Sequence, residues 1–586
     1  MSSFSIGQRS GLAPVNSLEE LLTSAARLGF AAVSGGRMTD PVLRRSTRCD
    51  YQMNGALALA RLLSIDPREA ATRVMDSVDL GQFVKHVEIA PSGFINLTVR
   101  DELLSRLVNE QVADPALGVP AAPMARRVVV DYSHPNVAKE MHVGHLRTTI
   151  IGDAIVRVLQ RVGHTVIKRN HIGDWGTPFG MLVEHLLDIG EESTAELLSM
   201  GDLNGFYRAA REKFDSDPDF ARRSRSRVVS LQSGDERSLA LWRVLVDQSV
   251  GYFQQVYAKL GVLLRPEDVV GESSYNTMLP SVAADLAAVG LVVESDGALC
   301  CFPNGFVTRD GDPLPLIVRK SDGGYGYAAT DLAALRNRAG ALRADEILYV
   351  VGAPQREHLA MCIAVAREAG WVPPSVRTAH VAFGSVLGPD HRPFRTRAGG
   401  SIRLIDLLDE AVDKAGQVVR EKNPALGSDA HEAIAEAVGI GAIKYAELSI
   451  DRVKDYVFDW SHMLSFEGNT GPYLQYAHVR ARSLLRKAGS PGEAAIIVRA
   501  AEERKLALTL LEYGKAVAET ISDYAPSKLC TYLHGVAEAF AAFYESCPIL
   551  KAAPDVRESR LALTAATATL LEDGLGLLGI AAPEHL

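Results

Sequence analysis

Hydrophobic positions repeat with two different periods in the middle of the chain. The runs RRVVVDYS and HTVIKRNHIGD are short, apolar and rich in β-branched residues, which predicts buried strands. Between them, LRTTIIGDAIVRVLQRVG has the spacing of an amphipathic helix, with Gly163 placed to end it. A strand, a helix and a strand in succession form a βαβ unit, so we expect the two strands to be parallel.

A second unit of the same kind follows downstream. EILYVVGA and RTAHVAFGSVLG have the pattern of strands, and QREHLAMCIAVAREAG between them has the pattern of a helix. We therefore predict an α/β fold for residues 124–400, with a Rossmann-type, doubly wound parallel sheet. A charged, mostly helical insertion is expected between the two units, at about residues 185–270.

The flanking segments have different patterns. Residues 1–115 predict an α+β domain, in which SLEELLTSAARLGF forms a helix capped by Ser17 and HVEIAPSGFINLTV forms a hairpin. A linker rich in Ala, Pro and Gly follows at residues 113–125. After the sheet domain the strand pattern fades, which predicts a helical connecting region at 401–460 and an α-helical domain at 461–586.

Composition and charge narrow the class of protein. The chain has 586 residues, of which 47% are hydrophobic and 23% charged, as in ordinary globular proteins. Its net charge of −9 neither indicates a nucleic-acid partner nor excludes one, because a local basic face can act on an acidic protein. Six cysteines without a CxxC pair disfavour a disulfide framework and a cysteine zinc site. Without a signal-peptide pattern or a long apolar run, we expect a cytoplasmic protein that does not contact membranes.

The stretch DYSHPNVAKEMHVGHLRTTIIGD gathers hydrogen-bond donors where the first strand of the sheet domain meets its first helix. In open α/β sheets ligands bind at that edge, and a helix N-terminus there offers free N–H groups to an anion. His142, His145 and Lys139 can donate to phosphate oxygens, and Gly144 lets a flat ring approach the backbone. This set is suited to a nucleoside triphosphate whose α-phosphate is attacked.

Other interpretations of these residues are weaker. A metal pair is disfavoured because HExxH is absent and no third ligand stands nearby, and the clustering disfavours simple core or capping histidines. No Walker A sequence occurs. A GxGxxG sequence at Gly574–Gly579 leaves no room for a βαβ unit after it, so we interpret it as chance.

HVGH resembles the HIGH motif of class I aminoacyl-tRNA synthetases, and SHPNVAKEMHVGHLRTTIIGD as a whole resembles the arginyl-tRNA synthetases. The resemblance covers essentially the whole chain. Further matches come in the order of that family: DYQMNGALALA, GFINL, NHIGDWGTPFG, GESSYNTMLP, YAATDLAALRNR, RPFRTRAGGSIRLIDLLDEA and GNTGPYLQYAHVRARSLLR. Its HIGH region comprises Pro135, Asn136, Val137, Ala138, Lys139, Glu140, Met141, His142, Val143, Gly144 and His145.

The resemblance implies an arginine–tRNA ligase that uses ATP, L-arginine and tRNA(Arg). The arginine carboxylate would attack the α-phosphate of ATP, pyrophosphate would leave, and the arginyl group would pass to the terminal adenosine of the tRNA. ATP would arrive as its Mg²⁺ complex, and no tightly bound cofactor is expected. The implied catalytic residues are Lys139, His142, His145 and Arg395, and the implied ATP contacts are His142, Gly144, His145 and Arg395.

The expected arginine pocket has a physical rationale. A guanidinium is planar and always charged, so carboxylates in bidentate geometry recognise it best. Tyr327 and Asp331 lie four residues apart and share a face if their segment is helical. Without the resemblance, Asp331 would be interpreted as a solvated helix charge. The arginine-binding set that the resemblance implies is Asp131, Asn136, Glu272, Tyr327, Asp331 and Gln355.

Two places depart from the family pattern. The second class I motif, KMSKS, is replaced by GPDHRPFRTRAGG, which contains Arg395 and Arg397 but no lysine. The resemblance implies that Lys139 compensates for the missing lysine. In GDWGTPFG, Pro178 stands where the family usually has glutamine, so this loop differs locally.

The flanking domains take their expected roles from the resemblance. Residues 1–115 would contact the elbow of the tRNA and residues 461–586 its anticodon, and the protein would act as a monomer. A basic run in the second domain could bind phosphates or could form an ordinary solvated helix face. It consists of Arg480, Arg482, Arg486 and Lys487.

Two other functions are compatible with parts of the sequence. A related ligase could adenylate arginine or another small molecule for a non-tRNA acceptor, but the complete terminal domains disfavour it. A catalytically inactive tRNA-binding paralogue is disfavoured by the intact HVGH and arginine-pocket residues. The sequence does not distinguish a housekeeping enzyme from a duplicate with altered inhibitor sensitivity, nor does it identify the tRNA nucleotides that are read.

Overall fold

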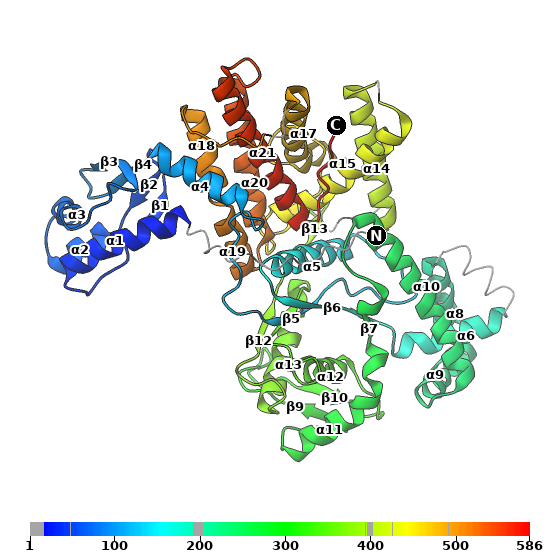
Figure 1. The fold of residues 1–586 in the computed structure, drawn as a ribbon. Coiled ribbons are helices and arrows are strands. Elements are labelled where there is room, and N and C mark those ends of the chain that lie inside the picture. The colour runs from blue at the N-terminus through cyan, green and yellow to red at the C-terminus, as the bar shows by residue number, and fades with distance from the viewer. Residues whose placement is uncertain are drawn as a thin grey trace.

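The computed structural model describes residues 17–46, 48–190, 203–392, 394, 402–424, 426–489 and 492–586. Figure 1 shows an N-terminal domain in blue that projects to one side and a central sheet in cyan and green. A bundle of helices in yellow to red lies above the sheet. A separate arm of helices extends from the sheet domain, on the side opposite the N-terminal domain.

The central sheet has five strands, and every neighbouring pair is parallel. Their spatial order is β12-β11-β5-β6-β7, so the chain builds outward from β5 to one side and then returns to the other. This order confirms the expected doubly wound, Rossmann-type sheet. The strands are β5 (Arg127–Asp131), β6 (Thr165–Ile172), β7 (Val269–Gly271), β11 (Glu346–Tyr349) and β12 (Arg377–His380).

Alternate residues of the central strand enter two hydrophobic cores. Val128 and Val130 of β5 face the core that includes α5 (Gly144–Arg161), whereas Val129 faces the core that includes α12 (Tyr327–Ala339) and α13 (Arg356–Glu368). The side-chain period of two along a strand produces this division. All three valines are buried, as expected where helices cover both faces of a parallel sheet.

The longer segments with a clear hydrophobic period fold as expected, whereas several strands of two to four residues are not predicted. β5, α5, β6, β11 and α13 coincide with the runs that predict them. RTAHVAFGSVLG is not a single strand, because β12 ends at His380 and β13 (Val386–Leu387) pairs instead with β14 (Tyr456–Val457). An antiparallel sheet between β7 and β11 is not predicted by the pattern, since its strands have only three or four residues. They are β8 (Val293–Ser295), β9 (Ala298–Cys301) and β10 (Leu316–Arg319).

The described helices between β6 and β7 form the arm in Figure 1, in the region where the sequence predicts a helical insertion. Pro178 occupies the first turn of its first helix, where no backbone N–H is needed for the helical ladder. The departure from the family pattern at Pro178 is therefore compatible with a helix that begins there. The helices of the arm are α6 (Thr177–Ile189), α8 (Leu203–Ser216), α9 (Pro218–Gln232) and α10 (Glu236–Leu260).

The N-terminal domain joins helices to a four-stranded antiparallel sheet of order β1-β2-β4-β3. Ser17 caps α1 as expected: its hydroxyl accepts from the backbone N–H of Glu20, and the Glu20 carboxylate accepts from the backbone N–H of Ser17. The expected hairpin is β3 with β4. The elements are α1 (Leu18–Ser34), β1 (Leu43–Arg45), β2 (Tyr51–Met53), α2 (Ala56–Leu63), α3 (Pro67–Asp76), β3 (Val84–Ile89), β4 (Ile95–Val99) and α4 (Asp101–Ala113).

The C-terminal part is helical, and α15 packs against α17 and α20. Helices on both sides of residue 460 therefore belong to one bundle. Gly574 and Gly576 lie inside α21, which rules out a phosphate-binding βα turn at the GxGxxG sequence. None of the described helices is both long and apolar enough to cross a membrane. The helices are α14 (Leu404–Lys422), α15 (Ser428–Ser449), α16 (Trp460–Met463), α17 (Gly471–Ala488), α18 (Ala501–Leu510), α19 (Tyr513–Asp523), α20 (Pro526–Ser546) and α21 (Pro554–Leu577).

A buried ion pair ties the sheet domain to this bundle. Nε of Arg147 in α5 lies 3.0 Å from a carboxylate oxygen of Glu447 in α15, and both side chains are at most 1% exposed. Arg147 also donates to the carbonyl of Lys454, and Tyr456 donates its hydroxyl proton to Glu447. Further hydrogen bonds therefore support both members of the pair, although Nη2 of Arg147 has no partner among the described residues.

Removing one partner of this pair should strongly destabilise the protein. In Arg147→Met the Glu447 carboxylate loses its cation in a fully buried site, and we expect the free energy of unfolding to fall by about 3–5 kcal/mol. The double variant Arg147→Met/Glu447→Leu should recover much of the loss, because it leaves no buried charge. Urea unfolding of the parent, the single and the double variants measures both effects. A single variant as stable as the parent would contradict this role of the pair.

Candidate active site

The carboxyl ends of the parallel strands bring the expected site residues to one edge of the sheet. Asp131 is the last residue of β5, and Glu272 directly follows β7. The chain turns from β5 to β6 on one side and to β11 on the other, so the edge beside β5 is the topological switch point. Ligands of doubly wound folds bind in the crevice at that point.

The HVGH residues begin α5 and are held by two backbone hydrogen bonds. The N–H of Gly144 donates to Nδ1 of His142 over 3.0 Å, and the N–H of His142 donates to Nδ1 of His145 over 3.1 Å. The two imidazole centroids lie 4.1 Å apart. A neutral imidazole that accepts at Nδ1 carries its proton at Nε2. Both histidines therefore keep Nε2–H as a donor for a ligand.

Gly144 has a steric reason to be glycine. A Cβ at this position would lie 2.7 Å from Cε1 of the His142 ring, closer than real Cβ contacts allow. The ring that approaches this backbone is thus first of all that of His142. The residue is exposed, so its surface faces the crevice rather than the core.

The loop before HVGH has strained backbone. Ser133, His134 and Ala138 have φ values of 82°, 52° and 59°, in a region that side chains rarely adopt. The N–H of Ala138 donates to Ser249 in α10, and the N–H of Ser133 donates to Thr148 in α5. Surrounding elements therefore enforce a conformation that the loop alone would not keep, as is common at functional sites.

Lys139 is exposed at the crevice and has an aromatic neighbour. Its Nζ lies 4.4 Å from the ring centroid of Tyr207 in α8. None of the ion pairs between described residues includes Lys139. Its neighbour Glu140 is instead paired with Arg403, with 3.2 Å between Nη1 and the carboxylate. The positive charge of Lys139 is thus held by a ring rather than neutralised by a carboxylate.

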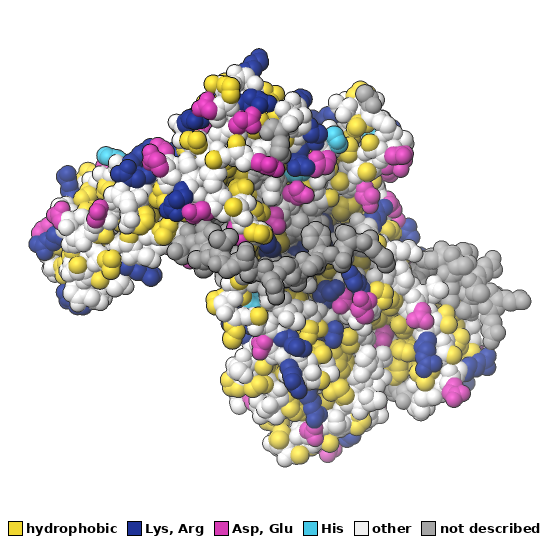
Figure 2. Space-filling model, viewed as in Figure 1, with side chains coloured by type: hydrophobic (Ala, Val, Ile, Leu, Met, Phe, Trp, Pro, Cys, Tyr) yellow, Lys and Arg dark blue, Asp and Glu magenta, His cyan; other side chains and the backbone are white. Residues whose placement is uncertain are grey.

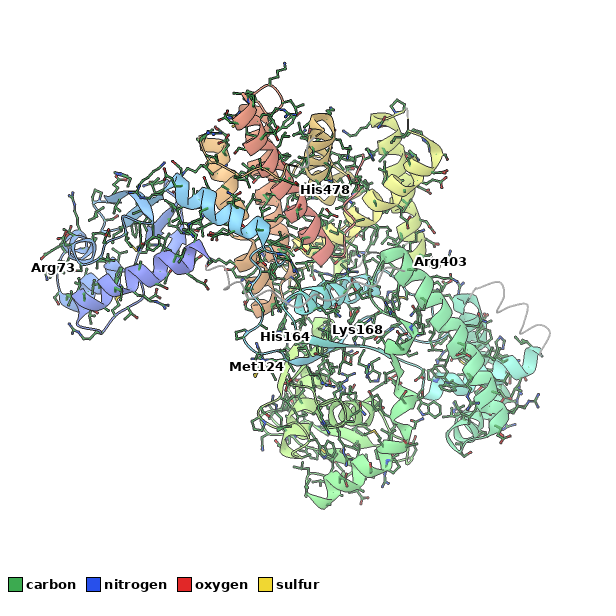
Figure 3. All side chains as sticks on the ribbon, viewed as in Figure 1. Arg73, Met124, His164, Lys168, Arg403 and His478 are labelled. Carbon is green, nitrogen blue, oxygen red and sulfur yellow. The ribbon has the colours of Figure 1, made fainter. Side chains whose placement is uncertain are left out.

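The segment that follows the replaced KMSKS loop returns to the HVGH residues. His142 and Arg403 form an antiparallel bridge, and the N–H of Leu404 donates to the carbonyl of Met141 over 2.8 Å. Figure 3 labels Arg403 at the foot of α14, beside α10. The two expected loop arginines, Arg395 and Arg397, lie outside the described residues.

Three carboxylates meet at the expected arginine pocket. Asp331 lies one helical turn after Tyr327, the first residue of α12, so the expected shared face exists. Burial, together with the charges of Asp174 and Asp331, raises the pKa of Glu272 to about 8. A cation beside Glu272 would oppose both causes and favour the ionised carboxylate. The group is suited to receive a cationic ligand.

The remaining expected pocket residues lie at the rim. Tyr327 is 70% exposed, and Asn136 and Gln355 are exposed as well. Asn136 forms a parallel bridge with Gly173, just beyond β6, and Gln355 ends the 3-10 turn that precedes α13. Their side chains are accessible to a ligand above the carboxylates.

Asp131 differs from these residues because its carboxylate has protein partners. Oδ2 lies 2.6 Å from Nη2 of Arg338, and Oδ1 lies 2.9 Å from Nε2 of His134. Burial opposes its charge, but the Arg338 guanidinium and His134 hold the pKa of Asp131 well below its usual range. The side chains of Asp131 and Arg338 are at most 2% exposed. Asp131 therefore lies beneath the crevice.

Several residues of the site are not predicted by the sequence. Nε2 of His358 donates to Oδ2 of Asp331 over 2.7 Å, and this hydrogen bond raises the pKa of His358. The ring of Tyr349 lies under the Arg338 guanidinium, with 5.0 Å between the ring centroid and Cζ of Arg338. His358 stands three residues after Gln355 in the chain, which is the only local signal for it.

The basic residues expected on α17 have different partners. Arg482 and Arg486 pair with Glu584 at 2.8 and 3.1 Å, and Arg480 lies over the ring of Tyr476. Two of the four cations are thus already neutralised by a carboxylate. On the face shown in Figure 2, positive and negative side chains are interspersed over the helical bundle, without a continuous basic patch.

Family models match three consecutive parts of the chain. Residues 24–99 match "Arginyl tRNA synthetase N terminal domain", residues 107–460 match "tRNA synthetases class I (R), catalytic domain", and residues 474–586 match "DALR anticodon binding domain". Together these models cover the N-terminal domain, the sheet domain with its arm, and most of the helical bundle.

Relatives and solved structures agree along the whole chain. The chain is 52% identical to an arginine–tRNA ligase of Thermobifida fusca, over 95% of this chain and 97% of the relative. It is 46% identical to the arginine–tRNA ligase of Escherichia coli K12, over 97% of this chain and 100% of the relative. Its fold is similar to arginyl-tRNA synthetase of Plasmodium falciparum, with a TM-score of 0.82, 26% identity and coverage of 98% and 100%. It is also similar to the arginyl-tRNA synthetase of Thermus thermophilus, with a TM-score of 0.77 and 27% identity. That match covers 96% of this chain and 100% of the solved one.

His145 should stay neutral far below the pH at which a free histidine titrates. Burial, with His142 nearby, lowers its pKa to about 3, so its Nε2–H tautomer should persist in mildly acidic solution. Because the unfolded chain binds this proton near pH 6.5, stability should fall by up to about 1.4 kcal/mol per pH unit as pH drops from about 6.5 to about 3. Long-range ¹⁵N spectra of histidine-labelled protein, assigned with His145→Gln, test this. Titration of His145 near pH 6.5 would contradict it.

Proposed function

The chain belongs to the arginyl-tRNA synthetase family, and from that premise we propose how its residues divide the reaction. It is an arginine–tRNA ligase, which activates L-arginine with ATP and transfers the arginyl group to tRNA(Arg). The observation that carries the assignment of the pocket is the group of three carboxylates at the sheet edge, in which Glu272 has no ion pair among the described residues and Asp331 is paired with His358 alone. In this proposal the HVGH histidines and Lys139 lie next to the arginine pocket and bind ATP.

Asp331 and Glu272 are the carboxylates that receive the substrate guanidinium. The pKa of Glu272 is raised to about 8, so an arriving cation would favour its ionised form and gain a second charged partner. Tyr327 at the rim would cover the side chain of arginine. Asn136 and Gln355, exposed above the carboxylates, would hold its α-amino and carboxylate groups. Asp131 would not contact arginine directly. It would act on the pocket through its ion pair with Arg338, which joins β5 to α12.

His142 and His145 bind the triphosphate through Nε2–H, and Gly144 leaves space at the start of α5. Neutral donors that are already oriented cost little reorganisation as charge develops on the phosphates. ATP enters as its Mg²⁺ complex, in which the ion neutralises part of the phosphate charge. The arginine carboxylate attacks the α-phosphorus, the bond to the bridging oxygen breaks, and pyrophosphate leaves with the electron pair.

Lys139 supplies the mobile positive charge that the missing KMSKS lysine would provide. Its ammonium is exposed beside His142 and is not neutralised by a carboxylate among the described residues. Arg395 is the second candidate, from the replaced loop. The hydrogen bond from the N–H of Leu404 to the carbonyl of Met141 joins the segment after that loop to the HVGH region.

The flanking domains bind the tRNA in this proposal, with residues 1–115 at its elbow and the helical domain at its anticodon. Arg480 and Lys487 of α17 are the better candidates for phosphate contacts, since Arg482 and Arg486 are paired with Glu584. We take the protein to act as a monomer in the cytoplasm. The tRNA would need to be bound before arginine is activated, a case of induced fit.

Asp331→Asn should damage arginine recognition and spare ATP. The neutral amide loses a charge-assisted pair, so kcat/KM for arginine should fall by a factor that corresponds to about 2–4 kcal/mol. The KM for ATP should change little. Asp285→Asn is a matched control, because Asp285 is a surface carboxylate beside α12 that is paired with Arg336. Steady-state aminoacylation with arginine varied measures both. Equal kinetics in the two variants would return Asp331 to an ordinary helix charge.

Lys139→Ala should slow the formation of arginyl-adenylate by about 100-fold or more, a loss of roughly 3 kcal/mol of transition-state stabilisation. Arg395→Ala should cost less, because Arg397 and backbone N–H groups remain in the loop. Equilibrium binding of arginine should be nearly unchanged in both. Single-turnover adenylate formation with bound tRNA isolates the chemical step. If Lys139→Ala reacts at the parent rate while Arg395→Ala is inactive, the loop arginine carries the charge instead.

A further inference from the structure

Behind the arginine pocket, a carboxylate, an imidazole and a thiol converge. Asp331 lies on α12, and His358 and Cys362 lie one turn apart on the neighbouring α13. One ligand atom from each residue lies within 4.8 Å of the others. None of the steps proposed for the reaction uses His358 or Cys362. The cluster therefore needs a separate explanation.

The distances are close to those of a tetrahedral metal site. Nε2 of His358 lies 3.7 Å from Sγ of Cys362 and 2.7 Å from Oδ2 of Asp331. Zinc bonds of about 2.0 Å to nitrogen or oxygen and about 2.3 Å to sulfur place such ligand atoms roughly 3.3–3.6 Å apart. The nitrogen and sulfur, 3.7 Å apart, are within about 0.2 Å of this range. The carboxylate would have to move by about half an ångström, which the rotation of one side chain provides.

The donor types and their exposure favour a zinc-like ion. Imidazole, thiolate and carboxylate together suit a borderline-soft divalent cation better than Mg²⁺ or Ca²⁺, which prefer oxygen. Cys362 is fully buried, whereas the side chains of His358 and Asp331 are 32% and 22% exposed. The ion would thus be approached from the side of the crevice. Three protein ligands leave the fourth position open there.

We propose that Asp331, His358 and Cys362 form an inhibitory site for a thiophilic divalent cation of the zinc class, which excludes arginine from its pocket. The inference rests on the proposed role of Asp331 in binding the guanidinium. Metal and substrate are both cations that need the same carboxylate, so they cannot occupy it together. The cation would act as a competitor of arginine and not of ATP.

Proton balance gives the site a characteristic pH dependence. Burial raises the pKa of the Cys362 thiol well above its ordinary value, so the free thiol is protonated at neutral pH. Binding forms a metal–sulfur bond, releases the thiol proton to solvent, and moves the imidazole proton of His358 from Nε2 to Nδ1. Affinity for the cation should therefore weaken as pH falls.

Direct binding tests the site without reference to arginine. We expect titration of the full chain with CdCl₂ to produce the ultraviolet thiolate-to-cadmium absorption band. A competing chromophoric chelator would report zinc affinity. Cys362→Ala should lose the band and bind zinc at least roughly 100-fold more weakly. Cys301→Ala is the matched control, because Cys301 is buried in the same core and is not part of the cluster. Equal binding by the two variants would overturn the site.

Kinetics test the link to arginine. With free zinc fixed by a metal buffer, aminoacylation by the parent and by Cys301→Ala should show a raised apparent KM for arginine and an unchanged kcat. Cys362→Ala should escape this inhibition while it keeps its activity without zinc. Inhibition that saturating arginine does not relieve, or that persists in Cys362→Ala, would overturn the proposal. Normal arginine kinetics in Asp331→Asn would instead refute the pocket assignment, so the two failures are distinguishable.

Discussion

The site depends on the buried ion pair between Asp131 and Arg338. Asp131 ends β5 and directly precedes the loop of HVGH, whereas Arg338 lies on α12, two turns after Asp331. Because both side chains are almost completely enclosed, the pair has one geometry, and it sets the ATP side and the arginine side of the crevice relative to each other. The pair also satisfies Asp131 with an internal guanidinium. In the proposed pocket, the carboxylates that remain for an arriving arginine are Glu272 and Asp331, of which Asp331 also contacts His358.

The same helix that begins with HVGH carries the link to the helical bundle. Gly144 and His145 are the first two residues of α5, and Arg147, three residues after Gly144, pairs with Glu447 in the bundle. Any displacement of α15 by bound tRNA would reach the triphosphate donors through a rigid path of less than two turns of helix. This connection is a physical basis for an active site that is completed by the tRNA, as the induced-fit proposal requires.

The sequence predicts those features that local periodicity or local spacing determines. β5, α5 and β6 follow from hydrophobic period alone, and the position of HVGH at the sheet edge follows from their order. Partners that are distant in the chain could not be predicted this way. Arg338 reaches Asp131 across about two hundred residues, and Glu584 neutralises Arg482 from about one hundred residues away. Strands as short as β13 have too few residues for a period to be visible.

In the proposed mechanism, the surroundings of Lys139 would keep a cation available to the triphosphate without the KMSKS lysine. A carboxylate beside an ammonium holds it firmly, but that pair must break before the charge can serve a phosphate. Glu140, the nearest carboxylate in the chain, is instead engaged by Arg403. Tyr207 attracts the ammonium by roughly 0.5–1 kcal/mol at an exposed site, without cancelling its charge. The ring would therefore hold the lysine weakly enough for it to move, and its full charge would be available to the phosphates in the proposed mechanism.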